Sequence, residues 1–397
     1  MRKFHIATEE EIKNAQTTDI YFLRTKEILE KEGRGDLRVT AEITTSSLPR
    51  NWDWGILAGV EEAARLLEGV DVDVKSFPEG TLFHANDVSG IREPVMVLEG
   101  KYADFCLYET PLLGLLCPAS GIATMAARVK RSAGTKTIIS FGIRRAHPAL
   151  APMIDRACYI GGFDGVSSLV GARMLGKSPS GTMPHSLIIA MGNQVLAWQS
   201  FDKHMPSDVP RIALVDTYCD EKTEAVMAAE ALGDRLAGVR LDTPGSRRGD
   251  FSEIIREVRW ELDSRGFKKV KIYVSGGLDD ESTRILAASG ADGFGVGTSV
   301  SNAPSIDFAM DIVEADGKPV AKRGKFGSRK EVWRCEKCLL EYVVHSSAAT
   351  PRCERCGGET IRLLTTLLKD GRVTESLPSP DTIRNRVLQQ LGILTTI

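Results

Sequence analysis

Four cysteines near the C-terminal end form the clearest chemical pattern in the sequence. Cys335 and Cys338 make one CxxC pair, Cys353 and Cys356 make a second, and fourteen residues separate the two pairs. Two CxxC turns at this spacing are typical of a tetrahedral zinc site with four thiolate ligands. Because four thiolates leave no open coordination position, we expect a structural Zn²⁺ ion, although iron is also chemically compatible and free thiols are the simpler alternative.

Two glycine turns have the composition of a phosphate site. Gly276 and Gly277 follow an apolar stretch that ends at Ser275, and Gly297 and Thr298 follow the next apolar stretch. Glycines let backbone N–H groups approach a phosphate, and a helix N-terminus adds a favourable dipole. A tight turn would explain one such pair, but two pairs after successive strands favour a phosphate ligand.

Several ionisable residues stand in neutral, glycine- or proline-bounded segments. Arg144 and Arg145 follow an apolar run, and arginine forks suit carboxylates and phosphates, although a solvated surface pair is the plainer interpretation. Asp164 lies in Gly-Gly-Phe-Asp-Gly, and His185 lies in Gly-Thr-Met-Pro-His-Ser. His185 precedes a run that we predict to be a strand, Leu187–Ala190, so the pattern alone gives it no catalytic role.

The elements that must position these residues alternate between strands and helices from Arg211 onward. Strands alternating with helices of this length indicate βαβ units and a parallel sheet. The predicted strands are 212–215, 239–241, 270–274 and 294–296, and the predicted helices are 221–233, 251–265 and 280–289. Their spacing gives one βα unit each.

Three further strands are expected upstream, at Thr137–Ser140, Tyr159–Gly161 and Leu187–Ala190. We therefore predict an α/β fold with a closed or nearly closed (β/α) barrel, and an open doubly wound sheet is the alternative. In both architectures ligands bind at the C-terminal ends of the strands. Asp216 and Asp242, which directly follow two of the predicted strands, are therefore candidate site residues.

Outside the barrel the pattern predicts smaller parts. Thr18–Lys31 is expected to be a helix with Thr18 or Asp19 as its N-cap, Leu37–Ile43 a half-buried strand, and residues 70–100 a β-rich segment. The expected domains are an α+β N-terminal domain (1–107), the barrel (108–300) and a C-terminal region (301–397). That last region should contain a lid strand, the zinc ribbon at about 333–360 and a terminal helix.

Composition excludes several classes of protein. The 397 residues include 51 Lys plus Arg and 53 Asp plus Glu, so the formal charge is −2, which argues against a nucleic-acid backbone binder. The N-terminus has no apolar core of a signal peptide, and the uncharged run Thr110–Ala127 is interrupted by proline and glycine, which favours a buried loop and helix over a membrane span. We expect a cytoplasmic protein with reduced thiols.

Nine short motifs, in order, resemble the nicotinate phosphoribosyltransferase family. They are Thr18-Asp-Ile-Tyr-Phe, Ala119-Ser-Gly-Ile-Ala-Thr, Phe141-Gly-Ile-Arg-Arg-Ala, Gly161-Gly-Phe-Asp, Gly181-Thr-Met-Pro-His-Ser, Leu214-Val-Asp-Thr-Tyr, Val239-Arg-Leu-Asp, Ser275-Gly-Gly-Leu-Asp and Gly295-Val-Gly-Thr. No single motif is specific, but the ordered set is. The resemblance runs from about residue 18 to 300 and does not include the cysteine ribbon, which suggests a subgroup of the family.

The resemblance implies a reaction and its cofactors. The family joins nicotinate to phosphoribosyl pyrophosphate (PRPP) in NAD salvage, releases nicotinate mononucleotide and pyrophosphate, and commonly uses ATP hydrolysis. Mg²⁺ and cationic side chains would stabilise the departing pyrophosphate, and no general base is needed for the attack of the pyridine nitrogen. The resemblance also implies a homodimer with an active site shared between subunits.

The resemblance assigns roles to individual residues. Tyr21 of the neighbouring subunit and Phe141 would stack on the two faces of the pyridine ring. His185 would be phosphorylated by ATP, while Arg144 and Asp164 would lie near the nicotinate. Asp216, Arg240 and Asp242 would line the ribose and pyrophosphate region, Gly276, Gly277, Gly297 and Thr298 would hold the 5′-phosphate, and Arg128 is a weaker candidate for pyrophosphate.

Other functions stay open at this point. A quinolinate phosphoribosyltransferase would share the barrel but would need a denser basic pocket for two carboxylates and no His185 motif. Nicotinamide is a closer alternative substrate, which sequence separates poorly from nicotinate. A zinc-ribbon protein that binds nucleic acid is a distant alternative, and the balanced charge argues against it.

Overall fold

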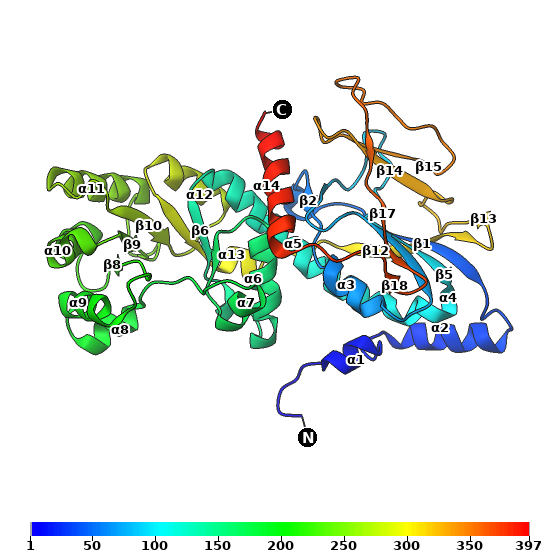
Figure 1. Cartoon of the computed structure of the whole chain (residues 1–397), viewed down its shortest axis with the longest axis horizontal. Coiled ribbons are helices and arrows are strands. Elements are labelled where there is room, and N and C mark those ends of the chain that lie inside the picture. The colour runs from blue at the N-terminus through cyan, green and yellow to red at the C-terminus, as the bar shows by residue number, and fades with distance from the viewer. Residues whose placement is uncertain (1, 397) are drawn as a thin grey trace. The chain divides into compact units, whose positions relative to one another are not determined.

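The structure, a computed structural model, describes residues 2–396 and divides into two compact units (Figure 1). The first unit combines Met1–Thr124 with Pro304–Ile397, and the second is the continuous segment Met125–Ala303. The chain therefore leaves the first unit, builds the second, and returns to complete the first. The first change of unit falls inside a long helix, α5 (Glu109–Ala133).

A six-stranded parallel sheet forms the centre of the second unit. Its strand order is β7-β6-β11-β10-β9-β8, and all neighbours are parallel. The strands are β6 (Thr137–Ser140), β7 (Gly165–Val166), β8 (Ile212–Leu214), β9 (Gly238–Leu241), β10 (Lys271–Ser275) and β11 (Gly293–Val296). This confirms the strand–helix alternation predicted from residue 211 onward.

The order of the strands is that of a (β/α) barrel rather than a doubly wound sheet. The first strand, β6, pairs with the last, β11, which closes the cycle of a barrel. Among the described residues, β7 and β8 are not paired with each other, so the barrel-like sheet is open between these two strands. The predicted barrel class is confirmed in this nearly closed form.

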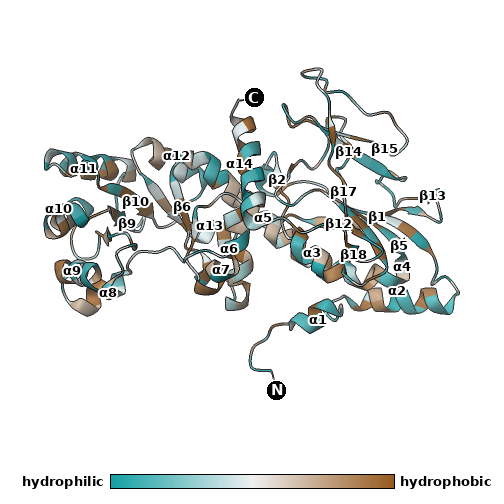
Figure 2. Ribbon diagram, viewed as in Figure 1, coloured by the Kyte–Doolittle hydropathy of each residue, from teal (hydrophilic) through white to brown (hydrophobic). Residues whose placement is uncertain are grey.

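Helices follow the strands of the second unit. They are α6 (Ala151–Ile160), α7 (Leu169–Met174), α8 (His185–Met191), α9 (Gln194–His204), α10 (Glu221–Leu232), α11 (Phe251–Ser264), α12 (Asp280–Ala288) and α13 (Thr298–Ser301). Figure 2 shows hydrophilic and hydrophobic bands on α11, whose apolar face, including Ile255 and Leu262, is buried. Such amphipathic helices pack one face on a sheet and expose the other.

Two predicted strands are wrong. Tyr159–Gly161 lies at the C-terminal end of α6, and the true strand, β7, begins a few residues later. Leu187–Ala190 lies inside α8. Short apolar runs fit a buried helix as well as a buried strand, so periodicity could not separate the two.

An antiparallel sheet of seven strands forms the centre of the first unit. The strand order is β13-β12-β1-β5-β3-β17-β18. The strands are β1 (Arg38–Thr45), β3 (Val72–Ser76), β5 (Met96–Lys101), β12 (Phe308–Ala315), β13 (Lys318–Pro319), β17 (Thr365–Lys369) and β18 (Arg372–Val373). Segments that precede the barrel in the sequence and segments that follow it thus form one sheet. Residues 70–100 contain β3 and β5 and are rich in strands, as predicted.

Strand β1 is buried on both faces, although its alternating pattern predicted a half-buried strand. Every residue from Val39 to Thr45 is buried. The polar face is covered because Lys330 pairs with the buried carboxylate of Glu42 at 2.9 Å. A polar residue in this strand therefore lies on a covered face, and the sequence pattern could not reveal its distant partner.

Helices and a small hairpin complete the N-terminal part of the first unit. They are α1 (Glu9–Lys13), α2 (Ile20–Lys31), α3 (Val60–Leu67), α4 (Tyr102–Phe105), and the paired strands β2 (Gly55–Ile56) and β4 (Leu82–Phe83). Asp19 holds the N-cap position of α2, as predicted. Its carboxylate accepts a hydrogen bond from the Thr110 hydroxyl at 2.8 Å.

The long apolar helix is a core element by its burial. Within the described residues, Tyr102–Ala133 alone has the length and hydropathy to cross a membrane, and 67% of its most apolar window is buried inside the protein. We predicted a loop and a helix over Thr110–Ala127, but α5 continues through Pro118 without a loop.

A small three-stranded sheet and a terminal helix follow β13. The strands β14 (Lys330–Arg334), β15 (Glu341–His345) and β16 (Ile361–Arg362) are antiparallel in the order β15-β14-β16. Helix α14 (Pro380–Thr396) confirms the predicted terminal helix, whose expected last residue, Ile397, is outside the described residues. This small sheet carries the four-cysteine pattern.

Candidate active site

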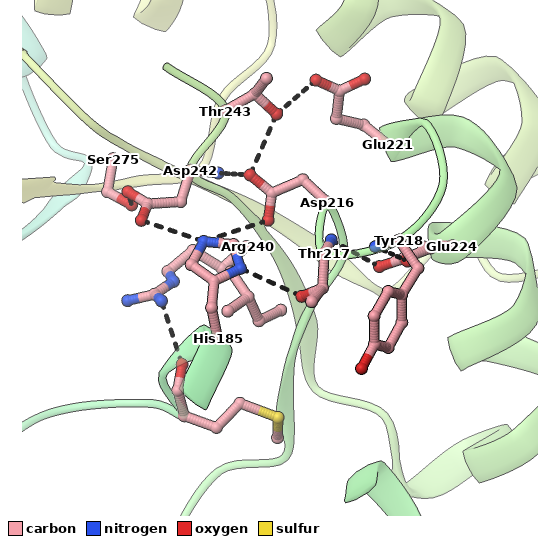
Figure 3. Close-up of polar contacts among 12 residues, drawn as sticks. His185, Asp216, Thr217, Tyr218, Glu221, Glu224, Arg240, Asp242, Thr243 and Ser275 are labelled. Carbon is pink, nitrogen blue, oxygen red and sulfur yellow. Dashed lines mark hydrogen bonds and ion pairs between the residues drawn. The ribbon is translucent and has the colours of Figure 1, made fainter. Parts of the chain in front are cut away.

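The C-terminal ends of β8, β9 and β10 bring together the polar side chains of the second unit (Figure 3). Asp216 follows β8, Asp242 follows β9, and Ser275 is the last residue of β10. The Ser275 hydroxyl donates a hydrogen bond to Asp242 Oδ1 at 2.6 Å, and the Asp242 amide donates one to Asp216 Oδ2 at 2.8 Å. Adjacent parallel strands therefore join the two carboxylates in one cluster.

His185 lies beside both carboxylates. Its Nε2 atom is 3.5 Å from Asp242 Oδ2 and 3.8 Å from Asp216 Oδ1, and its Nδ1 atom is 3.0 Å from the Thr217 hydroxyl. His185 is the first residue of α8, not a residue before a strand. The predicted strand Leu187–Ala190, which gave His185 no catalytic role, is therefore wrong, and the histidine lies beside two candidate site carboxylates.

Asp216 is the most buried carboxylate of the cluster. Its side chain is 3% exposed, and its Oδ2 atom also accepts a hydrogen bond from the Thr243 hydroxyl at 3.0 Å. Burial raises the pKa of Asp216 above the ordinary aspartate value, and the nearby His185 opposes that shift. Its Oδ1 atom has no hydrogen-bond partner among the described residues, which leaves one acceptor aimed at His185.

Arg240 places a cation at the same edge. Its side chain extends from β9, Nη2 donates a hydrogen bond to the Met183 carbonyl at 3.0 Å, and the guanidinium lies 5.8 Å from the centroid of the Phe141 ring. Burial lowers the pKa of Arg240, while Asp242 and Asp216 oppose that shift. An arginine remains charged under these conditions, so this edge carries a fixed positive charge.

The two glycine turns lie next to this cluster. Gly276 and Gly277 have φ angles of +93° and +72°, which favour glycine, and a Cβ on Gly276 would stand 3.2 Å from the Asp242 carbonyl oxygen. The turns are tied together because the Ser299 hydroxyl donates a hydrogen bond to the Leu278 carbonyl at 2.6 Å. Gly297, which precedes α13, lies in the second turn, so the structure brings both predicted phosphate turns to one place.

The remaining arginines are placed differently. Arg128 of α5 forms an ion pair with Asp280, the first residue of α12, at 3.1 Å, which places it beside the start of the helix after the first glycine turn. Arg144 and Arg145 lie in a short 3₁₀ turn after β6 and are exposed. Arg128 therefore lies beside the start of α12, and Arg144 lies on the loop that follows Phe141.

Asp164 lies near the N-terminal ends of β6 and β7, whereas His185 lies near the C-terminal ends of β8 and β9. It precedes β7, and its Oδ2 atom accepts hydrogen bonds from the Ile138 amide at 2.9 Å and from Lys130 Nζ at 3.0 Å. Ile138 is the second residue of β6, and Lys130 lies near the end of α5. Asp164 thus contacts Lys130 and Ile138 and does not join the cluster of His185, Asp216 and Asp242, and its place near the pyridine ring stays a prediction.

Tyr21 belongs to the first unit, unlike the other candidate substrate-binding residues. It is in the first turn of α2 and is 55% exposed. Its hydroxyl oxygen lies 3.4 Å from Asp19 Oδ2. An exposed aromatic side chain at this position is available to another subunit.

The four cysteines of the ribbon come together as predicted. Their sulfur atoms lie within 4.8 Å of one another, and those of Cys335 and Cys356 are 3.6 Å apart. Tetrahedral Zn–S bonds of about 2.3 Å require S···S distances close to this value. Burial would raise the pKa of Cys353, but backbone N–H groups, first that of Cys356, and the Tyr342 hydroxyl lower it to about 6, which favours a thiolate ligand.

The sequence analysis missed three residues that contact the cluster of His185, Asp216 and Asp242 or its loop. Thr217, Glu224 and Thr243 had no predicted role, yet each contacts the cluster or the loop that forms it. Thr217 and Thr243 each directly follow a predicted site aspartate, a signal that could have found them. Glu224 lies inside a predicted helix, and no local pattern distinguishes it from a surface glutamate.

Comparisons with known proteins agree with this geometry. The chain matches the model of the "Quinolinate phosphoribosyl transferase, N-terminal domain" over residues 19–120 and that of the "C-terminal domain" over residues 122–311. A solved structure from Pyrococcus furiosus, described as a nicotinate-nucleotide pyrophosphorylase, is 54% identical with a TM-score of 0.95, and the match covers 100% of this chain and 99% of that one. The fold and site therefore define a phosphoribosyltransferase of pyridine nucleotide metabolism.

The curated relatives narrow this class. A nicotinate phosphoribosyltransferase of Mycobacterium tuberculosis is 32% identical over 351 residues, which are 84% of this chain and 72% of that protein. One of Bacillus subtilis is 30% identical over 339 residues, with coverage of 76% and 68%. The chain belongs to the nicotinate phosphoribosyltransferase family. Human nicotinic acid phosphoribosyltransferase shares the fold, with a TM-score of 0.76 at 21% identity over 94% of this chain and 93% of that one.

Proposed function

We propose that the protein joins nicotinate to PRPP, forming nicotinate mononucleotide and pyrophosphate in NAD salvage. The observation that carries this proposal is the cluster of His185, Asp216 and Asp242 at the C-terminal edge of the sheet. The names of the relatives from Mycobacterium tuberculosis and Bacillus subtilis support the choice of substrate. The matching domain models are described as those of quinolinate phosphoribosyl transferase. Because a quinolinate enzyme needs no such histidine motif, His185 favours nicotinate as the substrate.

The geometry suggests how the chain would act on these substrates. The backbone of the two glycine turns would hold the 5′-phosphate, and Arg240 would meet negative charge that grows on the departing pyrophosphate. Phe141 beneath the Arg240 guanidinium would offer a face for a flat aromatic ring. Positioning of the two reactants and stabilisation of charge are the expected sources of rate, since the pyridine nitrogen is itself the nucleophile.

The oxygen atoms of the cluster fit a Mg²⁺ ion that enters with the substrates. Asp216 Oδ1 has no hydrogen-bond partner among the described residues, and the Asp242 side chain is 30% exposed. Carboxylate oxygens and substrate phosphates are the usual Mg²⁺ ligands. Bound there, Mg²⁺ would neutralise charge on the pyrophosphate, while Asp216 and Asp242 would hold it.

ATP coupling would act through His185. A neutral imidazole must offer one nitrogen lone pair to a phosphoryl group, and the Thr217 hydroxyl engages Nδ1 while Nε2 faces the carboxylates. A phosphorylated histidine at the pyrophosphate edge would then link ATP hydrolysis to ribosyl transfer. The coupling would shift the equilibrium towards nicotinate mononucleotide, further than the reaction with PRPP alone.

One assay tests the substrate assignment. Purified protein would receive labelled nicotinate, nicotinamide or quinolinate with PRPP and Mg²⁺, with and without ATP. We expect nicotinate to give nicotinate mononucleotide, and to give it faster with ATP. We expect little product from nicotinamide or quinolinate. Product from quinolinate with release of CO₂, or a preference for nicotinamide, would reject the proposal in favour of the corresponding alternative.

The ribbon and the assembly complete the proposal. Cys335, Cys338, Cys353 and Cys356 would hold one structural Zn²⁺ ion, and elemental analysis should find one zinc per chain that is absent in Cys353→Ser.

The protein would work as a cytoplasmic homodimer that shares its active sites through Tyr21. A nucleic-acid role for the ribbon is disfavoured by the balanced charge.

A further inference from the structure

Glu224 is a buried carboxylate that the proposed reaction does not use. It lies in the first turn of α10 and is 0% exposed. No lysine or arginine forms an ion pair with it within residues 2–396. Its charge is instead met by the helix N-terminus and by backbone amides, which are the groups that stabilise a buried carboxylate without a counter-ion.

The amides come from three successive residues of the loop after β8. Thr217 N–H donates a hydrogen bond to Glu224 Oε2 at 3.1 Å, and the amides of Tyr218 and Cys219 donate to Oε1 at 2.8 and 2.9 Å (Figure 3). One side chain therefore fixes the backbone of the whole loop. Because the loop starts directly after Asp216, its shape decides where the next side chain, that of Thr217, can point.

The Thr217 side chain links this loop to His185. Its hydroxyl oxygen lies 3.0 Å from His185 Nδ1, while His185 Nε2 is 3.5 Å from Asp242 Oδ2. A hydrogen bond at one ring nitrogen fixes the rotation and the tautomer of an imidazole, and so decides what the other nitrogen presents. Glu224, Thr217 and His185 thus form a chain of contacts that ends at the ring.

We propose that Glu224 is a positioning residue for the phosphorylation of His185 by ATP. It holds the Thr217 hydroxyl against Nδ1 and so keeps Nε2 directed at the carboxylate edge. This inference rests on the proposed ATP coupling. It requires that loss of Glu224 impairs the ATP-dependent step and spares the basal transfer from PRPP, because neither Glu224 nor its three amides contact the glycine turns or Arg240.

The Glu224→Gln variant tests the first link of this chain. The glutamine oxygen can still accept the amides of Tyr218 and Cys219, but its NH₂ group then faces the Thr217 N–H, donor against donor. We expect His185 labelling from ATP phosphorylated with ³²P at the γ position to fall at least tenfold, with basal transfer within twofold of wild type. The ratio of rates with and without ATP should approach one.

Thr217 variants test the second link. Thr217→Val, which lacks the hydroxyl, should lose labelling, and Thr217→Ser, which keeps it, should restore labelling. If Glu224 acts through Thr217, the double variant Glu224→Gln/Thr217→Val should lose no more labelling than Thr217→Val alone, since the two effects are not independent.

A matched control separates positioning from stability. Glu79 is also buried and also accepts two backbone amides, those of Gly59 and Glu61, but in the first unit. Glu79→Gln should lower the unfolding temperature as Glu224→Gln does and leave labelling unchanged.

The outcomes are distinguishable. Full labelling in a folded Glu224→Gln protein, or equal loss of basal and ATP-stimulated rates, would overturn the positioning role while the proposed ATP coupling stands. Absence of labelling in the wild type would overturn the ATP coupling and this inference with it, and would leave the transfer reaction itself intact.

Discussion

At the scale of single residues, His185 is the side chain on which three elements converge. It starts α8, its Nδ1 atom meets Thr217 after β8, and its Nε2 atom faces Asp242 after β9. Burial raises the pKa of Asp216 beside it, and His185 opposes that rise. A buried carboxylate with a raised pKa beside a histidine is a pattern that is common at functional sites.

Replacement of His185 by alanine gives the first prediction. His185→Ala should lose ATP stimulation, because the imidazole is the proposed phosphoryl acceptor, and should keep part of the basal transfer, because the pyridine nitrogen attacks without it. Without the histidine to oppose burial, the pKa of Asp216 should rise further, so the acid limb of the basal pH profile should move to higher pH. Initial rates with and without ATP across pH test both effects.

His204→Ala is the control for that experiment, since His204 is an exposed residue at the end of α9. It should behave as wild type in both respects. An unchanged ATP response in His185→Ala would exclude the phosphohistidine role.

At the scale of elements, the strand-to-helix turns form the site. Gly277 is exposed, has a φ angle of +72°, and a Cβ there would meet no protein atom within 4 Å. Nothing in the packing of the described residues requires that space to be free. A phosphate that approaches the backbone would use it, which is the expected reason for two glycines after β10.

The Gly277→Ala variant tests this interpretation of the turn. The added methyl group should raise the KM for PRPP at least tenfold, because it enters the space assigned to the 5′-phosphate. Gly290→Ala is the matched control, since Gly290 is also exposed with a positive φ angle of +106° and lies at the other end of α12. Both variants should lose about 1 kcal/mol of stability from backbone strain. Equal KM values for the two would count against a phosphate at this turn.

A second group of elements is joined by one buried ion pair. Arg334 of β14 pairs with Glu341 of β15, and also donates hydrogen bonds to the Leu82 carbonyl and the Gln390 side chain. His84 Nδ1 lies 2.5 Å from Glu341 Oε2. The cysteine ribbon, the β2–β4 hairpin and α14 therefore meet at a single network.

The pH dependence of stability tests that network. Burial alone would raise the pKa of Glu341, but Arg334 and then His84 hold it below the ordinary 4.5, at about 2. A depressed carboxylate pKa stabilises the folded state above the unfolded pKa, and this contribution is lost as pH falls from about 4.5 to about 2. Glu341→Gln should cost about 3–5 kcal/mol at pH 7, because it removes the carboxylate that forms the buried ion pair with Arg334.

Denaturant unfolding of the full chain measures this effect. The difference in unfolding free energy between wild type and Glu341→Gln should shrink as the pH approaches 3. Glu281→Gln, which removes an exposed partner of Arg284, should change the free energy by less than about 1 kcal/mol at either pH. A pH-independent difference for Glu341→Gln would contradict the ion-pair explanation.

At the scale of the whole molecule, the candidate residues are divided between the two units. The site cluster lies in Met125–Ala303, whereas Tyr21 lies on α2 of the first unit and is exposed. A shared site in a symmetric dimer would use both, with Tyr21 from one copy and His185 from the other.

Complementation between two inactive variants tests that assembly. Tyr21→Ala and His185→Ala would each be deficient in ATP-stimulated transfer, but a heterodimer of the two would contain one intact site. Co-refolding in equal amounts should recover about one quarter of the wild-type stimulated rate, because half the dimers are mixed and each has one working site. No recovery from confirmed heterodimers would mean that both residues serve a site within one chain.

Much of the architecture followed from the sequence because the signals are local. The strand–helix alternation from residue 211, the terminal helix and the two CxxC turns depend on periodicity and spacing within short segments. The first glycine turn was identifiable for the same reason, since the positive φ angles of Gly276 and Gly277 are properties of single residues. Ordered motifs then indicated the family, which the relatives confirmed.

Only the tertiary structure decided which of these residues meet. The short run Leu187–Ala190 lies in helix α8 rather than in a strand, and His185, the first residue of that helix, lies beside Asp216 and Asp242. The structure also placed Asp164 before β7, where its carboxylate contacts Lys130 and Ile138. Glu42 with Lys330 and Glu224 with its three amides are contacts whose partners or burial no local pattern encodes. The sequence by itself determined the repeating units and the four-cysteine cluster, because these depend on neighbours in the chain. The fold decided the site, because it depends on neighbours in space.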